Sequence, residues 1–307
     1  MPPSARQALL RCFRSSRLLT IVKKAFPDFL KSAVVAAIAS GQKGMIDLGG
    51  GVELSYPLDD FYWSRVADNI RAYEPEMWLA LDCLLDSGTL FIDCGANIGL
   101  WSCYAAMKAG DGRRVVAAEP GFKVFPYLLR NCRKNNLNFT VLRKAIWSRS
   151  GENKVFLTYE GHASSSLVED ASMKLLGRVS VETISIDDAV DAAIADASAV
   201  SSIIIKVDVE GVECEAIAGA EHTLGRDNVL LIYEEHGSKL ASPATELCLE
   251  KGLNIYYYAN GSMRPISGTQ QAAALKKDCH KGYNFFACKP GTGFDARLSA
   301  LVAAVPA

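Results

Sequence analysis

Between residues 66 and 235, short apolar runs alternate with longer stretches of helical periodicity. Five of the runs have the length of buried strands, namely 89–93, 114–118, 139–142, 202–207 and 228–233. Three stretches between them place apolar residues at helical spacing, namely 99–109, 121–135 and 212–223. This alternation predicts an α/β domain in which a mostly parallel sheet carries helices on both faces.

Two segments upstream of this core have patterns of their own. Residues 44–63 alternate loosely around Gly49-Gly50-Gly51 and predict a small hairpin or cap. From about 66 to 87 the pattern turns helical, with a start signal at Glu74-Pro75-Glu76 and a stop signal at Asp86-Ser87-Gly88. We therefore expect a cap followed by a helix before the first core strand.

Downstream, the pattern is less regular. Residues 150–200 read as an insertion, with β-like pieces at 154–158 and 179–184 around a polar loop. The runs 254–258 and 283–288 predict the last two sheet strands, with a loop between them. The expected organisation is a basic helical arm with a small cap over 1–65, the main domain over 66–290 and a C-terminal tail over 291–307.

The first forty residues are strongly basic. Asp28 is their one acid, against Arg6, Arg11, Arg14, Arg17, Lys23, Lys24 and Lys31, with apolar residues interspersed. A basic amphipathic helix of this kind suits a peripheral contact with a membrane surface. A homo-oligomerisation arm and a helix that covers the domain fit the same pattern, and the pattern does not separate the three.

Composition restricts the class of protein. The formal net charge is −1 and the sequence pI is about 6.4, which argues against nucleic acid as a partner. No apolar run reaches the roughly 18–20 residues that span a bilayer. Nine cysteines are scattered singly without a C-x-x-C pair, so a zinc ribbon is not expected. Reduced thiols in a cytoplasmic protein are the expectation.

The loop after the first core strand has the layout of a nucleotide site. Residues 91–102 read FIDCGANIGLWS, a strand followed by Gly95-Ala96-Asn97-Ile98-Gly99 and then an apolar helix. The central glycine of G-x-G-x-x-G is missing, which argues against a dinucleotide and against an NAD-linked oxidoreductase. A P-loop is excluded because no Gly-Lys-Ser/Thr follows.

Two acids at strand ends indicate the cofactor. Asp93 would repel a pyrophosphate but would attract an ammonium group, and S-adenosylmethionine carries one together with a carboxylate and a sulfonium. The carboxylate could approach loop amides, and Gly95 and Gly99 would let the backbone come close. Glu119 ends the next strand, where a carboxylate hydrogen-bonds ribose hydroxyls, and Pro120 then turns the chain.

A second acidic cluster follows the strand 202–207. Asp208 lies at the carboxyl end of that strand, where open α/β sheets bind ligands, and Glu210 follows it. Glu234 and His236 follow the next strand, so we expect all four at one edge as candidates for a general base. We also expect Asp208 to contact the cofactor, close to its sulfonium. The carboxylate oxygens of Asp208, Glu210 and Glu234 would suit magnesium, but no pattern demands a metal, and we expect none.

At this point the motifs resemble those of FkbM-type S-adenosylmethionine-dependent methyltransferases. FIDCGANIG resembles the D-x-G-A-N-x-G loop of that family, and Tyr73-Glu74-Pro75-Glu76 resembles its Y-E-P segment. Residues 203–220, IIIKVDVEGVECEAIAGA, resemble its I-K-x-D-x-E-G-x-E segment, and Glu234-Glu235-His236 resembles its E-x-H ending. The resemblance covers roughly residues 70 to 240.

The resemblance implies a class I, Rossmann-like fold with seven strands, of which the last hairpin is antiparallel. It also implies S-adenosylmethionine as cofactor and methyl transfer to a hydroxyl of a sugar, glycan or other small molecule. For adenine we expect backbone groups around Lys144 and Ala145, and for the acceptor the polar loop from Gly161 to Ser166. A non-catalytic cofactor-binding protein of the same fold is the alternative, which the intact Asp208-Val209-Glu210-Gly211 segment argues against.

Overall fold

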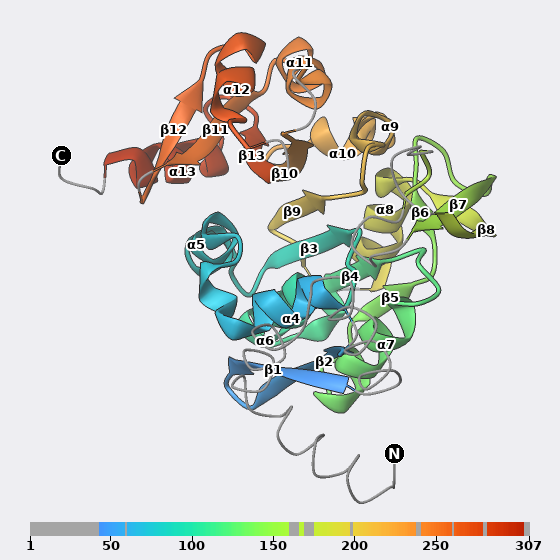
Figure 1. Cartoon of the computed structure of the whole chain (residues 1–307). Coiled ribbons are helices and arrows are strands. Elements are labelled where there is room, and N and C mark those ends of the chain that lie inside the picture. The colour runs from blue at the N-terminus through green and yellow to red at the C-terminus, as the bar shows by residue number, and fades with distance from the viewer. Residues whose placement is uncertain are drawn as a thin grey trace, which may run out of the picture. The chain divides into compact units, whose positions relative to one another are not determined.

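The structure is a computed structural model (Figure 1). It describes residues 43–58, 60–159, 166–168, 175–196, 199–237, 241–259, 261–278 and 281–303. The chain divides into two compact units between Glu74 and Pro75, whereas the sequence placed the boundary at 65/66. The basic arm and most of the polar loop at 161–166 lie outside the described residues.

The first unit contains the predicted hairpin. Strands β1 (Lys43–Gly49) and β2 (Val52–Pro57) pair antiparallel across the triple-glycine turn, and alternate residues of β1 are buried. Helix α4 (Phe61–Asp68) follows, because the Asp60 carboxylate accepts the N–H groups of Tyr62 and Trp63 and so caps the helix. A 3₁₀ turn, η1 (Ile70–Ala72), ends the unit. The helical pattern predicted over 66–87 is thus split between α4 and a second helix.

The second unit is built on an eight-stranded sheet in the order β12-β11-β13-β10-β9-β3-β4-β5 (Figure 1). The strands are β3 (Thr89–Cys94), β4 (Val115–Ala118), β5 (Thr140–Leu142), β9 (Ser202–Val207), β10 (Val229–His236), β11 (Asn254–Ala259), β12 (Ser262–Ile266) and β13 (Gly282–Cys288). The first five run parallel, and β13 runs antiparallel to both β10 and β11. This is the predicted seven-stranded arrangement, extended by β12 at one edge.

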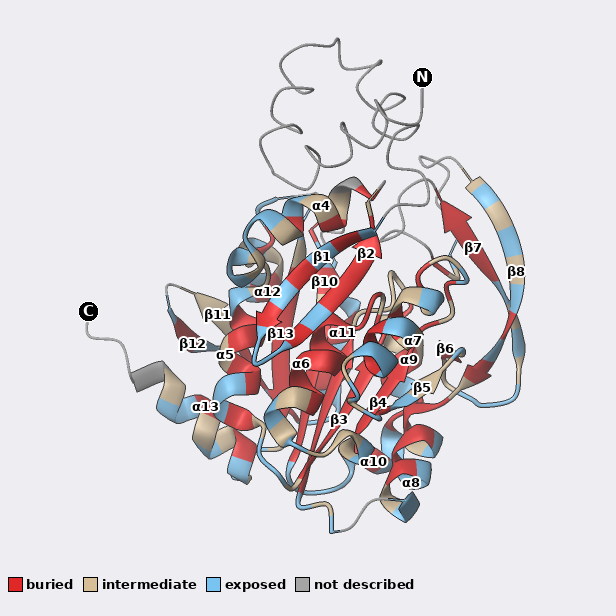
Figure 2. Cartoon of the chain, turned by 90° about the horizontal axis from the view of Figure 1, so that it is seen from below, coloured by how far each residue is buried: buried red, intermediate tan, exposed pale blue. Residues whose placement is uncertain are grey.

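Helices cover both faces of this sheet. Leu90, Ile92 and Cys94 of β3 point into a core formed with α8 (Ile186–Asp196), α9 (Glu213–Ala218), α10 (Glu221–Leu224) and α11 (Pro243–Glu250). The alternate residues of β3 face α6 (Leu100–Ala109), to which Asp93 is hydrogen-bonded through Ser102. Helix α5 (Pro75–Leu84) packs on α6, with the Trp78 ring 4.7 Å from the rings of Trp101 and Tyr104. Because both faces are covered, β3 and β9 are buried along their whole length (Figure 2).

The predicted insertion contains a small sheet and a helix. Strands β6 (Ala145–Ile146), β8 (Leu175–Ile184) and β7 (Asn153–Tyr159) form a three-stranded sheet in that order. Helix α8 then leads into β9 and was not predicted from the sequence. Its buried residues Ile186, Ala189, Val190 and Ala193 have helical spacing. The segment is therefore a regular crossover helix that follows a small added sheet.

Three other predictions, one of a helix, one of a loop and one of the tail, need correction. The helix predicted at 212–223 is two short helices, α9 and α10, interrupted at Gly219, which lies against the Trp147 carbonyl. The loop expected between β11 and β13 contains β12 and α12 (Thr269–Leu275). The tail contains α13 (Gly293–Ala303), whose Asp295 accepts hydrogen bonds from Asn254 and Tyr256 of β11. Helix α7 (Phe125–Lys134) and the 3₁₀ turn η2 (Gly112–Arg114) complete the unit.

Candidate functional site

The glycine loop links the ends of two strands. The N–H groups of Gly95 and Ala96 both donate to the Ala118 carbonyl of β4, at 3.0 Å, and the N–H of Asn97 donates to Glu119 Oε2 at 2.8 Å. These three amides are therefore engaged in hydrogen bonds within the protein. The contact of a cofactor carboxylate with the loop stays a prediction.

Glycine is required at both ends of this loop. Gly95 has φ of +83°, and a Cβ there would lie 1.8 Å from the Asp208 carbonyl oxygen. Gly99 caps α6 with φ of +87°, and a Cβ there would lie 2.6 Å from a Leu128 methyl group of α7. The two glycines let the loop pass between the end of β9 and helix α7.

Asp93 is a buried acid with one unused oxygen. Its side chain accepts a hydrogen bond from Ser102 through Oδ2, whereas Oδ1 is buried without a hydrogen-bond partner among the described residues. Burial raises the pKa of Asp93, and the ammonium of Lys206, its register partner on β9, opposes this shift. A buried acceptor without a partner is costly, so the site suits a ligand that brings a donor. An ammonium group such as that of S-adenosylmethionine fits this requirement.

Glu119 is held at the end of β4 by two backbone amides. Its Oε1 accepts from the N–H of Gly121 at 2.6 Å and its Oε2 from Asn97. Burial nevertheless raises its pKa to about 7, and the negative charges of Asp93 and Asp208 act in the same direction. The carboxyl group is fixed in orientation, as a ribose-binding acid requires, and Pro120 follows it directly.

Replacing Glu119 by glutamine is expected to change how stability depends on pH. The folded-state pKa of about 7 exceeds the ordinary value of 4.5, so the native state retains a proton that the unfolded chain releases. This stabilisation is complete below pH 4.5 and is lost as the pH rises through 7. Urea unfolding should show wild type losing about 3 kcal/mol relative to Glu119→Gln across that window. Glu221→Gln, at an exposed position, is the control, and parallel profiles for wild type and Glu119→Gln would contradict the assignment.

Lys206 and Asp208 bring opposite charges to the end of β9. The Lys206 ammonium is buried and lies 2.7 Å from Asp208 Oδ2. Burial alone would raise the pKa of Asp208, but Lys206, a hydrogen bond with Glu234 and the nearby His236 together hold it below its usual value. Asp208 is therefore ionised at neutral pH while a second carboxyl group contacts it.

Glu234 and His236 lie on the same face of β10, whereas Glu235 points the other way. Glu235 is buried in an ion pair with Lys276 at 3.0 Å and accepts the N–H of Thr245, so its role is structural. Glu234 occupies space opposite Gly282 of β13, where a Cβ would overlap its carboxylate. His236 is exposed at the strand end. The strand thus presents one acid and one imidazole to the predicted edge.

Glu210 occupies a left-handed turn beside this cluster, with φ of +56°, next to Gly211. Burial and the negative charges of Asp208 and Glu213 raise its pKa well above the usual value. Its carbonyl accepts a hydrogen bond from the Ser166 hydroxyl, and Glu213 accepts the N–H of Gly211. Ser166 is the described member of the predicted acceptor loop, and it is joined to the acidic turn.

Lys144 and Ala145 lie where the chain leaves β5, next to the Glu119 strand end, because the Glu119 N–H donates to the Leu142 carbonyl. The Lys144 side chain pairs with Glu182 at 2.7 Å, and Ala145 is buried in β6. The Lys144 ammonium is thus engaged in an ion pair, which leaves backbone groups for the predicted adenine contact. Within the part of the chain that the structure describes, no three His, Cys, Asp or Glu side chains are placed to hold a metal ion.

Three side chains at the site were not predicted. Lys206 had a visible signal, a lysine within the otherwise apolar SIIIKV strand. Ser102 had a weaker one, as a polar residue among apolar neighbours at the start of α6. Glu76 had none, because its partner Asn284, which donates to it at 3.0 Å, is distant in sequence.

The strand order and directions define a class I methyltransferase fold, with the glycine loop after β3 and the acid after β4 at the positions where that class binds S-adenosylmethionine. Residues 93–250, just over half of the chain, match the family described as methyltransferase FkbM domain. The chain therefore belongs to the FkbM methyltransferase family and is an S-adenosylmethionine-dependent methyltransferase. No curated protein sequence matches it significantly.

Several solved structures are similar to the chain. The precorrin-6y C5,15-methyltransferase of Geobacter metallireducens has 13% identity and a TM-score of 0.38, over 70% of this chain and 87% of that one. The methyltransferase FkbM of Methylobacillus flagellatus has 16% identity and a TM-score of 0.39, over 66% of this chain and 44% of that one. A SAM-dependent O-methyltransferase of Thermotoga maritima has 14% identity and a TM-score of 0.37, over 80% of this chain and 77% of that one. These likenesses are loose, and the fold assignment rests on strand order and the family match.

Proposed function

We propose that this methyltransferase transfers the methyl group to a hydroxyl oxygen of a neutral sugar, glycan or other small molecule. The observation that carries the proposal is Asp208, an acid kept ionised by a buried lysine at the carboxyl end of the central sheet. A hydroxyl acceptor must lose its proton during transfer, so it needs a base at this place. The chemistry of the acid cluster therefore favours an alcohol.

The charges around Asp208 also favour a neutral acceptor. Glu234 contacts Asp208, and Glu210 and Glu213 lie close enough for the pKa of Glu210 to be raised. A carboxylate or phosphate acceptor would meet repulsion from the ionised Asp208 carboxylate, and like charges in a partly desolvated site are costly. Hydroxyl groups, in contrast, can donate hydrogen bonds to the carboxylates. This supports a polyol or phenol over an anionic acceptor.

We assign cofactor binding to the glycine loop and to the acids that end β3 and β4. Asp93 would accept the ammonium, the segment from Gly95 to Gly99 would lie along the ligand, and Glu119 with Pro120 would meet the ribose. S-Adenosylmethionine supplies an electrophilic methyl group on its sulfonium when bound. The protein's contribution is to hold the acceptor oxygen in line with it, to exclude water and to remove a proton.

We assign to Asp208 the role of the base that takes the proton from the acceptor hydroxyl. Its Oδ2 accepts a hydrogen bond from Lys206, which fixes the orientation of the carboxylate. Glu210 and Glu234 would hydrogen-bond the acceptor or share the proton, because neighbouring carboxyl groups with different pKa values divide such roles. His236 is exposed at the end of β10 and would pass the proton to water.

A methyl-transfer screen with labelled cofactor tests this proposal. The acceptor panel should contain neutral sugars, phenols and lipid alcohols, with matched carboxylic acids, phosphates and amines. We expect label in ethers of neutral hydroxyl compounds. Label confined to nitrogen or carboxylate products would contradict the proposal. Calorimetry with S-adenosylmethionine, its demethylated product and NAD separates an oxidoreductase from a methyltransferase, because only the first two ligands should bind. A non-catalytic binder would bind the same two ligands but would transfer no label in the screen.

A further inference from the structure

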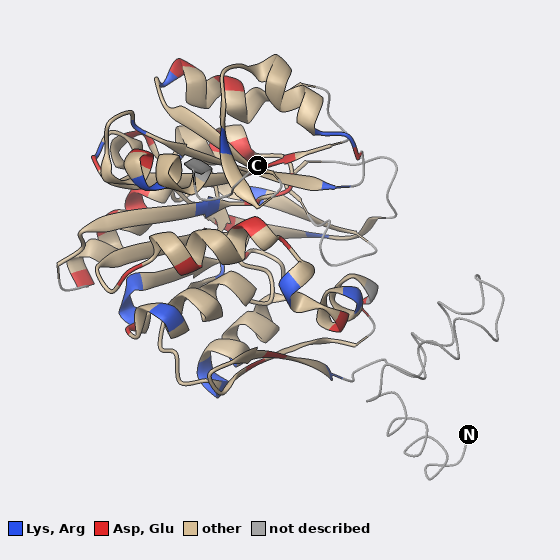
Figure 3. Ribbon diagram, turned by 90° about the vertical axis from the view of Figure 1, so that its left-hand side faces the viewer, with Lys and Arg blue, Asp and Glu red and all other residues tan. Residues whose placement is uncertain are grey.

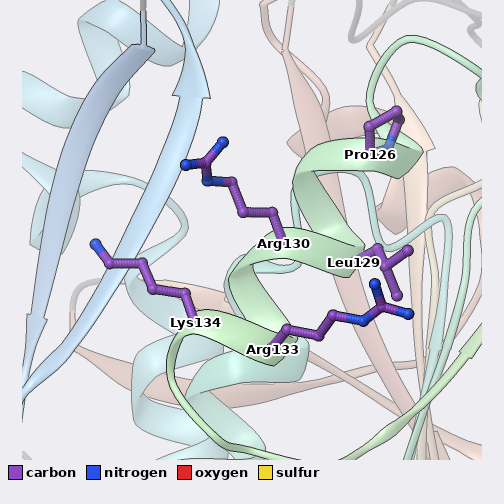
Figure 4. Close-up of a pocket in the computed structure, with 5 residues that line it drawn as sticks. All are labelled: Pro126, Leu129, Arg130, Arg133 and Lys134. Atoms are coloured by element: carbon purple, nitrogen blue, oxygen red, sulfur yellow. The ribbon is translucent and has the colours of Figure 1, made fainter.

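The exposed face of α7 carries a group of basic and apolar side chains that the methyl-transfer site does not use. We call it the α7 groove, defined by Pro126, Leu129, Arg130, Arg133 and Lys134, which line a cavity of about 640 Å³ (Figure 4). We propose that the α7 groove is the surface through which this protein binds a membrane containing anionic lipids.

The groove is one continuous stripe of the helix. Its residues follow at spacings of three and four, so they share a face, while Leu128, Asn131 and Cys132 of the opposite face are buried. Arg130 and Arg133 are exposed, and neither has an ion-pair partner among the described residues. Figure 4 shows the long basic side chains extending from the last turns of α7. Two guanidinium groups are thus available to an anionic partner.

The charge of the surrounding chain makes this stripe distinctive. Residues 1–42 carry seven basic residues and one acid, a net charge of +6, which leaves −7 for residues 43–307 when the whole chain is −1. Elsewhere on the ribbon, basic residues are interspersed with acids (Figure 3). A local basic stripe on this otherwise acidic stretch of chain suits a flat anionic surface that contacts one face only. A long flexible polyanion would also meet the acidic remainder.

Apolar side chains favour a lipid surface over a nucleic acid. Phe122, one turn before α7, is 40% exposed, and Pro126 and half-buried Leu129 follow on the same stripe. Basic residues beside exposed aromatic and aliphatic groups are typical of helices that lie in the membrane interface. A phosphodiester backbone would use the arginines but not the apolar residues.

The position of the groove leaves the methyl-transfer site free. Helix α7 starts just after Glu119 at the carboxyl edge and ends at Lys134, before β5 begins. Because β4 and β5 are parallel, the helix between them runs back to the amino edge of the sheet. Arg130, Arg133 and Lys134 therefore lie toward the edge opposite to Asp208. Membrane binding there and acceptor entry at the carboxyl edge do not compete.

Vesicle co-sedimentation of the full chain tests the proposal, with phosphatidylcholine vesicles containing or lacking phosphatidylserine. We expect binding only to the anionic vesicles and its loss at high salt, because screening shortens the range of the attraction. The variant Arg130→Glu/Arg133→Glu should weaken binding by at least about 25-fold, since each basic residue near an anionic leaflet contributes about fivefold.

The matched control is Lys251→Glu/Arg264→Glu, which reverses the same number of charges at exposed positions of the same unit, outside α7. It should bind anionic vesicles as wild type does. The proposal is overturned if the α7 variant binds like the control, which would assign binding to the basic N-terminal residues. It is also overturned if wild type ignores the vesicles, with or without binding to a single-stranded RNA added as a second probe. Methyl-transfer activity in solution should be unchanged in both variants.

Discussion

Gly95→Ala is expected to abolish measurable binding of S-adenosylmethionine and to destabilise the protein by about 3 kcal/mol or more. Two costs combine at this position. The backbone has φ of +83°, which a residue with a Cβ adopts only with strain, and the Cβ would lie 1.8 Å from the Asp208 carbonyl oxygen. The overlapping atom belongs to the backbone, so β9 and the glycine loop must separate. Calorimetric titration and urea unfolding measure the two effects.

Gly110→Ala separates strain from overlap. Gly110 ends α6 with φ of +70°, but a Cβ there would meet no atom within 4 Å. It should therefore cost only about 1–2 kcal/mol, the strain of one left-handed residue, and should leave cofactor affinity nearly unchanged. If Gly95→Ala behaves like Gly110→Ala, the close approach of the loop to Asp208 does not support the cofactor site.

The edge of the sheet where the glycine loop meets Asp208 was predictable from the sequence. Parallel strands bring their carboxyl ends to one edge, so the order of strands was enough to place Asp93, Glu119 and Asp208 together. The residues that position them were less accessible. Ser102 and Lys206 act through one hydrogen bond and one ion pair, and neither contact has a signature at fixed spacing. Sequence pattern identifies the edge of a sheet more readily than the partners of each acid.

Helices α8 and α12 illustrate a different limit. Helix α8 has a regular apolar spacing, but two β-like segments precede it, and these made the whole stretch resemble an insertion. Helix α12 has seven residues, of which Ala272 is buried, so its pattern is too short to identify. Strand β12 contains Pro265, which is tolerated because β12 is the edge strand of the sheet. The structure of such elements depends on their packing against the sheet more than on their local sequence pattern.

No helix within the described ranges is long and apolar enough to cross a bilayer. The basic residues before position 43 lie outside those ranges. Their predicted roles, a membrane contact, an oligomer contact or a cover for the domain, remain predictions. The α7 groove offers an independent route to the first of these roles, because its basic residues belong to the folded second unit.

Asp208→Asn is expected to lower kcat by about 10²–10⁴-fold, the usual contribution of a general base, while the affinity for S-adenosylmethionine changes only a few-fold. Asparagine keeps the shape of the side chain but cannot take a proton. The acceptor found in the labelled-cofactor screen provides the substrate for kcat, and calorimetry provides the cofactor affinity. Thermal unfolding must be measured as well, because the buried Lys206 loses its ion-pair partner.

Glu210→Gln is the matched control for this variant. Burial and the negative charges of Asp208 and Glu213 raise the pKa of Glu210 and so favour its protonated form, which glutamine closely resembles. Its kcat should therefore stay within a few-fold of wild type. If kcat fell strongly in Glu210→Gln and little in Asp208→Asn, Glu210 rather than Asp208 would be the general base. Because Lys206 lies 2.7 Å from Asp208 and lowers the pKa of Asp208, we expect the opposite result.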